Sequence, residues 1–250
     1  MTSEIITREE FMRKRSSSAK AMMENRGLLS RALDVKVEAG HDYMWVHQTT
    51  WMGEPCLQLP TDMLAMAEAI HKSQPEYIIE CGVAWGGTTL YLASLLSLIG
   101  GKSVIGIDVF IPNDVRERTA NSLVGNRIVL LEMSSVQESA LEHVRSLISG
   151  SSRVLVLLDS LHTHDHVLAE LNLYSSLIRE GQYLICGDTA IDIQPPAPTR
   201  PRPWGPGNNP ATALREFLET DIGRSFEVDA DIENRLLISN NWGGYLRRKM

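Results

Sequence analysis

Downstream of Pro75, short runs of Ile, Leu and Val alternate with longer amphipathic stretches, and this alternation restricts the fold more than any other feature. The short runs contain few polar residues, as expected for strands that are buried on both faces of a parallel sheet. Parallel neighbours need crossover connections, usually helices, so the pattern predicts a Rossmann-like, doubly wound α/β sheet. The expected strands are Tyr77–Glu80, Ser103–Asp108, Arg127–Glu132, Arg153–Asp159 and Gln182–Cys186, and the expected helices between them are Thr88–Ile99, Ser135–Ile148 and His164–Arg179.

The N-terminal part of the chain does not share this alternation. Residues 1–33 have an uneven helical pattern, and residues 41–60 are rich in Trp, Tyr, His and Gly, which is typical of a loop with exposed aromatic side chains. We therefore expect residues 1–74 to form a helical and aromatic cover segment, and residues 75–250 to form the α/β domain.

The C-terminal part departs from the alternation as well. Residues 193–210 contain most of the prolines of the chain, so a long irregular loop of the functional kind is expected there. A helix over 209–220 is predicted to precede two strands, Phe226–Ala230 and Arg235–Ser239. Their link is too short for a parallel crossover, so these strands are expected to pair antiparallel at the end of a mostly parallel sheet.

The charge and composition exclude several classes of protein. A net charge of −7 and a pI near 5.5 argue against nucleic acid or an anionic membrane surface as the main partner. No apolar run reaches the roughly 18 residues of a membrane span, and Met1–Arg15 lacks the apolar region of a signal peptide. The three cysteines are widely spaced, which favours reduced thiols and a cytoplasmic enzyme. The long N-terminal helical region is compatible with a homo-oligomer.

The most specific local motif is ECGVAWGGTT, from Glu80 to Thr89, which stands directly between a predicted strand and a predicted helix. Ligands of open α/β sheets bind at this end of the strands, and glycines permit a tight turn and a close approach of the backbone. The spacing is GxxxGG rather than the GxGxxG of dinucleotide-binding proteins, and Glu80 would repel a pyrophosphate but could pair with an ammonium group. The residues of this run that are expected to bind a cofactor are Glu80, Gly82, Val83, Ala84, Gly86, Gly87 and Thr88.

Polar residues follow the next two strands and extend this site. Asp108 ends the second strand, 26 residues after Gly82, where a carboxylate can accept both hydroxyls of a ribose. Ser134 and Ser135 follow the third strand, where a polar side chain could meet the edge of an adenine. Each residue alone could merely cap a helix or end a strand, but their common register favours an adenosine-containing cofactor.

Four longer motifs narrow this interpretation: WMGEP at 51–55, QLPTD at 58–62, IECGVAWGG at 79–87 and GGYL at 243–246. With the glycine spacing and the acid at the second strand end, the chain resembles the class I S-adenosylmethionine-dependent methyltransferases. It is most similar to the group of cephalosporin hydroxylases and rhamnosyl O-methyltransferases. The resemblance implies S-adenosylmethionine as cofactor, with Glu80 and the glycine-rich turn near its methionine part and Asp108 on its ribose.

Two further acids follow the fourth and fifth predicted strands. Asp159 and Asp188 are expected to converge, because the ends of parallel strands open on the same edge of the sheet as the glycine-rich turn. Two carboxylates there share a proton or hold a hard cation such as Mg²⁺. The arrangement resembles catechol-type O-methyltransferases, which implies Mg²⁺ held by Asp159 and Asp188, with Asp159 also in the catalytic and cofactor sites. That family has a base three residues after the first acid, and His162 holds this position here.

The methyl acceptor is expected to contact aromatic and histidine side chains, namely Trp51, His162, His164 and Trp204. Arg200 and Arg202, inside the Pro-rich loop, could bind a charged acceptor or could simply be solvated. We therefore predict an O-methyltransferase, assisted by Mg²⁺, that acts on a hydroxyl of a sugar-containing or natural-product metabolite.

Two other functions stay open on the sequence. The run HTHDH at 162–166 contains the residue types of an iron site, so an oxidoreductase or hydroxylase of small molecules is one alternative. Such an iron site needs two His and one carboxylate, and a β-sandwich scaffold is expected for it rather than a parallel sheet. Gly187 stands where the resembled group often has a second acid, so a non-catalytic subunit that binds S-adenosylmethionine is the other alternative.

Overall fold

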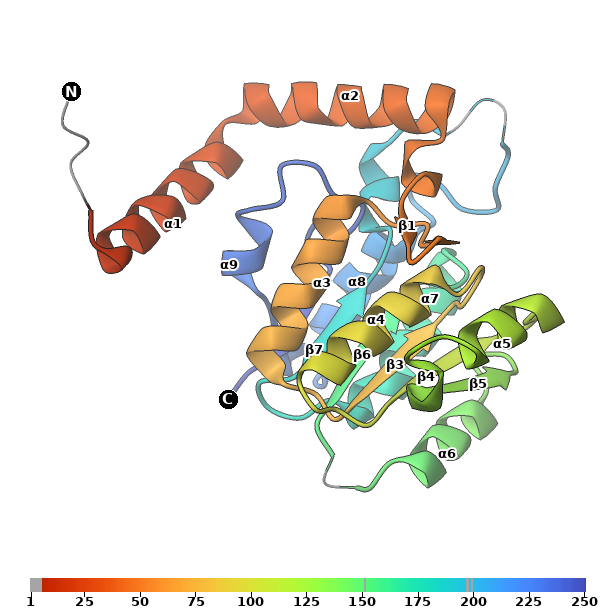
Figure 1. Ribbon diagram of the computed structural model, residues 1–250. Helices are drawn as coiled ribbons and strands as arrows, with labels where there is room; N and C mark the ends of the chain where they lie inside the picture. The colour runs from red at the N-terminus through yellow and green to blue at the C-terminus, as the bar shows by residue number, and fades with distance from the viewer. Residues whose placement is uncertain (1–5, 151, 197, 199) are drawn as a thin grey trace.

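A seven-stranded sheet runs through the centre of the computed structural model, which describes residues 6–150, 152–196, 198 and 200–250 (Figure 1). The strand order is β5-β4-β3-β6-β7-β9-β8, and the first five strands in this order are parallel. The predicted mostly parallel, doubly wound sheet is therefore confirmed. The five parallel strands are β3 (Tyr77–Cys81), β4 (Ser103–Asp108), β5 (Ile128–Glu132), β6 (Val154–Leu158) and β7 (Tyr183–Cys186).

The order of the strands reverses between β3 and β6, which lie side by side although β4 and β5 come between them in the sequence. Cys81 of β3 is in register with Leu158 of β6, and the N–H of Asp159 donates to the carbonyl of Cys81 at 2.8 Å. The glycine-rich turn and the first acid therefore leave the sheet next to each other. Reversals of this kind create the crevice in which open α/β sheets bind ligands.

Helices cover both faces of the sheet and explain why its strands are apolar throughout. Ile78 packs with the helices of one face and Ile79 with those of the other, and both side chains are fully buried. One face is covered by α3 (Pro60–Ser73), α4 (Gly87–Leu98) and α9 (Ala230–Glu233), and the other by α6 (Glu138–Leu147), α7 (His164–Tyr174) and α8 (Pro210–Glu219). A further helix, α5 (Asn113–Ala120), packs beside β5, and short 3-10 helices are η1 (Trp45–His47), η2 (Gly125–Arg127), η3 (Ser175–Leu177), η4 (Thr189–Ile193) and η5 (Gly223–Ser225).

The antiparallel edge of the sheet corrects one prediction. Its two strands are β8 (Phe226–Val228) and β9 (Tyr245–Arg248), and β9 lies between β7 and β8. The expectation that residues 235–239 form the second strand is wrong. That apolar run is a loop, in which Leu236 is buried beneath the helices and Ser239 donates a hydrogen bond to the buried Asp62. An apolar run can be buried without a strand when side chains satisfy the polar groups around it.

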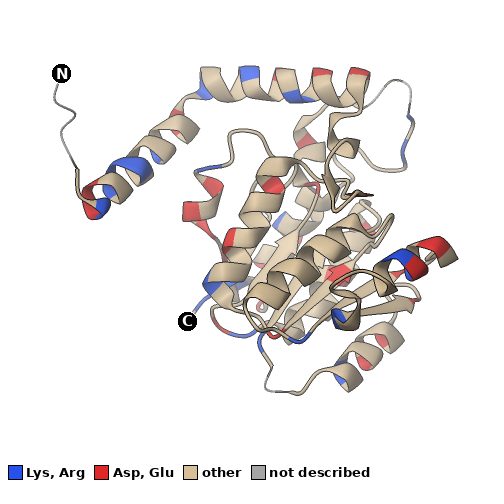
Figure 2. Cartoon of the chain, viewed as in Figure 1, with Lys and Arg blue, Asp and Glu red and all other residues tan. Residues whose placement is uncertain are grey.

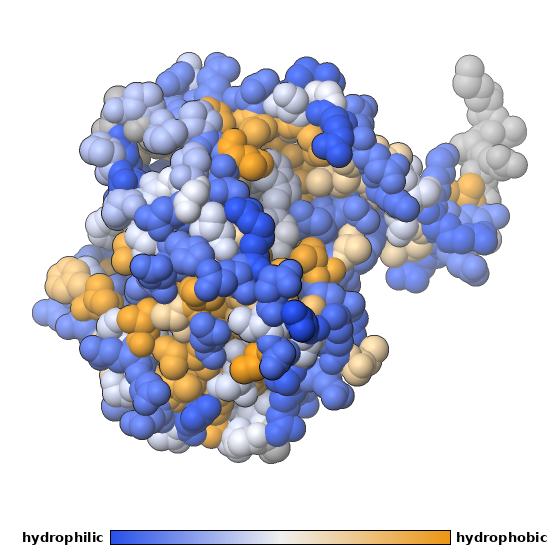
Figure 3. Space-filling model, turned by 180° about the vertical axis from the view of Figure 1, so that it is seen from behind, coloured by the Kyte–Doolittle hydropathy of each residue, from blue (hydrophilic) through white to orange (hydrophobic). Residues whose placement is uncertain are grey.

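The N-terminal region forms an arm and a cover. The arm is α1 (Arg8–Glu24), which buries none of its residues and projects from the body of the molecule with a largely hydrophilic surface (Figures 1 and 3). The next helix, α2 (Arg26–Tyr43), passes over the top of the molecule and leads into η1 and a small hairpin of β1 (Thr50–Trp51) and β2 (Glu54–Pro55). Among the described residues, no helix has both the length and the apolar content needed to cross a membrane.

Candidate active site

A cavity of about 840 Å³ opens at the carboxyl ends of the parallel strands. Its volume lies in the usual range for small-molecule sites. We call the residues that follow the strand ends the floor: Gly82, Val83, Ala84, Asp108, Ser135, Asp159, Ser160, His162 and Asp188. We call the residues contributed by the end of α2, η1 and the Pro-rich loop the roof: Gly40, His41, Val46, His47, Gln194, Pro195, Pro196, Arg200, Pro201, Arg202, Trp204, Gly205 and Pro206.

The glycine-rich turn holds the floor together through close backbone contacts. Gly82 has a φ of +97°, and a Cβ atom there would lie 2.1 Å from the carbonyl oxygen of Asp159. A Cβ atom on Gly87 would lie 2.2 Å from the carbonyl oxygen of Pro55. These glycines are therefore needed for the close packing of β3 against β6 and of α4 against the hairpin.

Asp108 ties the turn to the end of β4. Its Oδ2 atom accepts hydrogen bonds from the N–H groups of Val83 at 2.8 Å and Ala84 at 3.1 Å. The side chain is only half-buried and lines the cavity, as a carboxylate that receives ribose hydroxyls must. The predicted cofactor residues that line the cavity are Gly82, Val83, Ala84, Thr88, Asp108, Ser135 and Asp159, whereas Glu80, Gly86, Gly87 and Ser134 do not line it.

Glu80 lies directly before this turn and is completely buried. Thr89 donates a hydrogen bond to its Oε2 atom, and its Oε1 atom has no partner in the described part of the chain. Burial raises the pKa of Glu80 to about 8, although the hydrogen bond from Thr89 acts in the opposite direction. An ionised Glu80 is therefore unfavourable in this structure unless a positive charge comes close to the turn.

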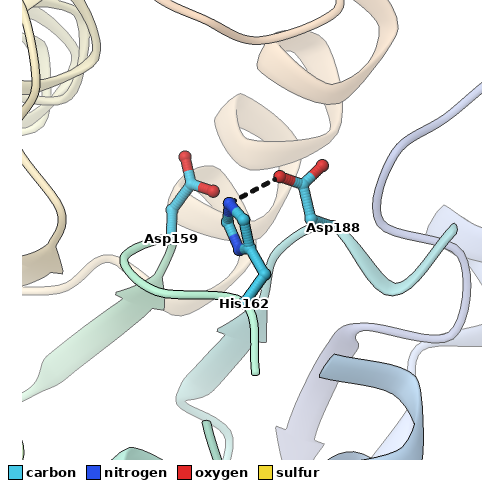
Figure 4. Close-up of side chains that lie close together, drawn as sticks. All are labelled: Asp159, His162 and Asp188. Carbon is cyan, nitrogen blue, oxygen red and sulfur yellow. Dashed lines mark ion pairs between the residues drawn. The ribbon is translucent and has the colours of Figure 1, made fainter. Parts of the chain in front are cut away.

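Asp159, His162 and Asp188 meet at the floor of the cavity (Figure 4). Each offers one ligand atom, and the three atoms lie within 4.8 Å of one another. The Nε2 atom of His162 is 3.1 Å from Oδ2 of Asp188. Burial, and next the negative charge of Asp188, raises the pKa of Asp159 well above its ordinary value. Two carboxylates that repel each other at this spacing suit a divalent cation with oxygen ligands, so the side chains present fit Mg²⁺.

Backbone geometry fixes the second acid. Asp188 has a φ of +53°, and its N–H donates to Oδ1 of Asn241 at 2.8 Å. Gly187 precedes it because a Cβ atom there would lie 2.9 Å from the carbonyl oxygen of Leu158 and 3.0 Å from Oδ1 of Asp159. The close approach of β7 to Asp159 therefore requires glycine where the resembled group often has an acid.

Gln58 belongs to the site, although the sequence did not predict a role for it. Its Nε2 atom donates to Oδ2 of Asp159 at 2.6 Å, and its side chain is 2 % exposed. Its Oε1 atom has no partner among the described residues. The signal for Gln58 was its place in the QLPTD motif, which carried the family resemblance but gave no role to this residue.

The other histidines after β6 do not join the acid pair. Nδ1 of His164 lies 2.9 Å from Oγ1 of Thr212, and Nε2 lies 3.1 Å from Glu216, so this ring is held against α8 outside the cavity. His166 lines the cavity but points into a buried polar cluster, where its Nε2 is 3.3 Å from the carboxylate of Glu170. The expected contact of His164 with the acceptor is thus not supported. Among the described residues, the acid pair has one imidazole beside it, whereas the iron site of a hydroxylase needs two.

The two tryptophans predicted to contact the acceptor lie in different surroundings. Trp204 lines the cavity, and its ring meets that of His162 edge-on with centroids 4.9 Å apart. Trp51 donates to Oγ of Ser94 at 3.0 Å and packs edge-on against Tyr91, so it fastens the hairpin to α4 and does not line the cavity. Of these two tryptophans, Trp204 is the one placed to touch an acceptor in the cavity.

The sequence model of one protein family, described as Rhamnosyl O-methyltransferase/CmcI, matches residues 43–249. A rhamnosyl O-methyltransferase of Mycobacterium bovis is 28 % identical over 228 residues, which are 88 % of each chain. The rhamnosyl O-methyltransferase of Mycobacterium leprae is 28 % identical over 231 residues, which are 89 % of this chain and 95 % of the other. The solved structure of CmcI with Mg and S-adenosylmethionine has the same fold, with a TM-score of 0.55, 21 % identity, and coverage of 82 % of this chain and 78 % of that one. The resemblance inferred from the sequence is confirmed.

Proposed function

Because the chain belongs to the Rhamnosyl O-methyltransferase/CmcI family, we propose that it transfers a methyl group from S-adenosylmethionine to a hydroxyl of a sugar-containing or natural-product metabolite, with Mg²⁺ at Asp159 and Asp188. The names of its relatives, rhamnosyl O-methyltransferases, support a saccharide acceptor. The observation that carries the proposal is the convergence of Asp159, His162 and Asp188 beside the glycine-rich turn.

The acids of the floor and Gln58 have separate tasks in this proposal. Asp108 would accept the ribose hydroxyls, since it lines the cavity and is already fixed by the N–H groups of the turn. Asp159 and Asp188 would hold the metal, and Gln58 would keep Asp159 in place through its 2.6 Å hydrogen bond. S-adenosylmethionine supplies an electrophilic methyl group when bound, and Mg²⁺ supplies positive charge that lowers the pKa of a nearby hydroxyl.

His162, whose Nε2 atom faces Asp188, would take the proton of the acceptor hydroxyl. Asp188, 3.1 Å away, would stabilise the imidazolium that results. Trp204 presents its ring beside His162 and would orient the acceptor, while the roof would exclude water from the reacting atoms. Within residues 1–74, the end of α2 and η1 would cover this site, because both contribute to the roof, whereas α3 packs on the sheet.

The test is calorimetric titration of the purified chain with S-adenosylmethionine and with NAD⁺, each with and without Mg²⁺. Labelled-methyl transfer to a panel of glycosides is measured in parallel. We expect binding of the methyl donor alone, and transfer that requires Mg²⁺ and stops in chelator. Binding of NAD⁺ in its place would contradict the proposal. Donor binding without transfer to any glycoside would favour a non-catalytic subunit.

A further inference from the structure

Charge is divided between the two sides of the cavity. The floor contains the acids Asp108, Asp159 and Asp188. The roof contains no acid, although the whole chain has 31 acidic and 24 basic residues apart from histidine. Its polar side chains are chiefly basic, since His41, His47, Arg200 and Arg202 all line it. The described residues of the Pro-rich loop between Gln194 and Pro206 likewise show basic but no acidic positions (Figure 2).

The basic side chains of the roof lie close to one another. Nη1 of Arg200 is 3.0 Å from Nε2 of His47, a contact in which the neutral imidazole accepts the hydrogen bond. Burial, and next the positive charge of Arg200, lowers the pKa of His47. Burial, and next the same charge, also lowers the pKa of Arg202. An anion bound between these groups would relieve the repulsion.

Neither roof arginine forms an ion pair with a carboxylate of the described chain. Other arginines of the molecule do so readily: Arg118 contacts Glu54 and Asp114, and Arg235 contacts Glu68 and Asp231. Guanidinium groups gathered without acids at the mouth of a cavity are suited to a carboxylate or phosphate supplied by a ligand, which they can bind with two parallel hydrogen bonds.

Trp204 connects these arginines with the acid pair. The guanidinium carbon of Arg202 lies 5.1 Å from the centroid of the Trp204 ring, and the ring of His162 meets the same indole with centroids 4.9 Å apart. An acceptor that lies against Trp204 therefore has His162 within reach at one part and Arg202 at another.

We propose that Arg200 and Arg202 bind an anionic group of the methyl acceptor, so that the substrates are acidic saccharides or metabolites that carry a carboxylate or a phosphate. That the bound anion belongs to a methyl acceptor rests on the proposed function. The binding of an anion by Arg200 and Arg202 does not depend on methyl transfer. Mg²⁺ on the floor would offset the repulsion between Asp159, Asp188 and such a ligand.

The test is calorimetric titration of the full chain with three probes: methyl α-glucoside, methyl α-glucuronide and glucose 1-phosphate. Each titration is run twice, once with both S-adenosylhomocysteine and Mg²⁺ present and once with both absent. We expect at least one anionic probe to bind about tenfold or more tightly than the neutral glycoside, and the stronger of the two identifies carboxylate or phosphate as the preferred group. The double variant R200Q/R202Q should remove this preference, and R224Q, at an exposed arginine on η5, should retain it.

The outcomes separate the two proposals. Failure to bind S-adenosylhomocysteine contradicts the proposed function. The titrations without S-adenosylhomocysteine and Mg²⁺ would still measure the preference of the chain for an anionic probe. Equal binding of neutral and anionic probes, or a preference that persists in R200Q/R202Q, overturns the anion site even when the methyl donor binds. Thermal unfolding of the double variant should match that of the parent chain, because neither arginine supports the core.

Discussion

The imidazole Nε2 atom of His162 lies 3.1 Å from the carboxylate of Asp188, and this contact joins the loops that follow β6 and β7. The sequence placed these two residues on separate strand ends, and the structure makes them partners. The pairing matters because Asp188 can both approach a cation and stabilise a protonated His162. In the proposed mechanism this contact would hold His162 in place as the base.

His162→Ala should lower kcat by about 10²–10⁴-fold, because general-base assistance contributes an effect of this size. Affinity for S-adenosylmethionine should stay within about twofold, since in the proposed function other residues of the floor would hold the donor. Steady-state kinetics and titration of the donor measure the two effects. His143→Ala is the control, because His143 is exposed on α6. Full turnover in His162→Ala would remove this residue from the mechanism.

Asp159→Asn should raise the melting temperature of the metal-free protein, because it removes a buried charge that Asp188 and Glu80 repel. The asparagine can still accept the hydrogen bond from Gln58. We expect Mg²⁺ to raise the melting temperature of the parent chain, and the same change should abolish that rise. Thermal unfolding with and without Mg²⁺ tests both parts, with Asp165→Asn, an exposed acid in the first turn of α7, as control. A normal response of Asp159→Asn to Mg²⁺ would place the cation elsewhere.

Glu80→Gln should change how stability depends on pH. Burial raises the folded-state pKa of Glu80 from 4.5 to about 8, so its contribution is fully present below the unfolded pKa and is lost as the pH rises through the folded pKa. The variant should therefore lack this decline, and at pH 7 its free energy of unfolding should exceed that of the parent by an amount on the order of 3 kcal/mol. Denaturant unfolding at a series of pH values measures the difference, with the exposed Glu142→Gln as control. Parallel pH profiles for parent and variant would show that Glu80 stays ionised, for instance through a nearby cation.

Gly187→Ala should destabilise the protein by about 1–3 kcal/mol, the usual effect of overpacking. The new methyl group would meet the carbonyl oxygen of Leu158 and the carboxylate of Asp159, so turnover should fall with stability. Gly150→Ala is the matched control, since a Cβ atom there meets nothing within 4 Å. Unfolding in denaturant and methyl transfer are measured on both variants. Equal stability of the two would mean that the loops after β6 and β7 can separate without loss.

The architecture of the sheet and the family were predictable because they depend on local patterns. Buried parallel strands have continuous runs of Ile, Leu and Val in the sequence. The glycine spacing together with Glu80 favours a cofactor other than a dinucleotide. The predicted class of enzyme, an S-adenosylmethionine-dependent O-methyltransferase, agrees with the family that the chain belongs to. Helix α5 was not predicted, because its sequence NDVRERTA offers only Val115 and Thr119 for burial.

The details that failed depend on contacts between distant segments. The antiparallel pair is completed by residues 245–248 and not by residues 235–239. Asp62 accepts hydrogen bonds from Ser239 and from the N–H of Asn240, and these bonds hold the earlier segment in a loop. The role of His164 is decided by Thr212 and Glu216 on α8. A single sequence contains no local sign of such partners, and the same is true of the hydrogen bond between Gln58 and Asp159.

The position of β9 between β7 and β8 also has a consequence for the order of events during synthesis. The N–H of Cys186 donates to the carbonyl of Gly244 and the N–H of Asp188 to Asn241, so segments close to β9 hold the end of β7 in place. A nascent chain that has just passed Asp188 has neither contact and leaves one edge of β7 unpaired. We expect the arrangement of Asp159, His162 and Asp188 to form only after the ribosome has released the residues of β9, while the half of the sheet that contains β3, β4 and β5 can already be folded.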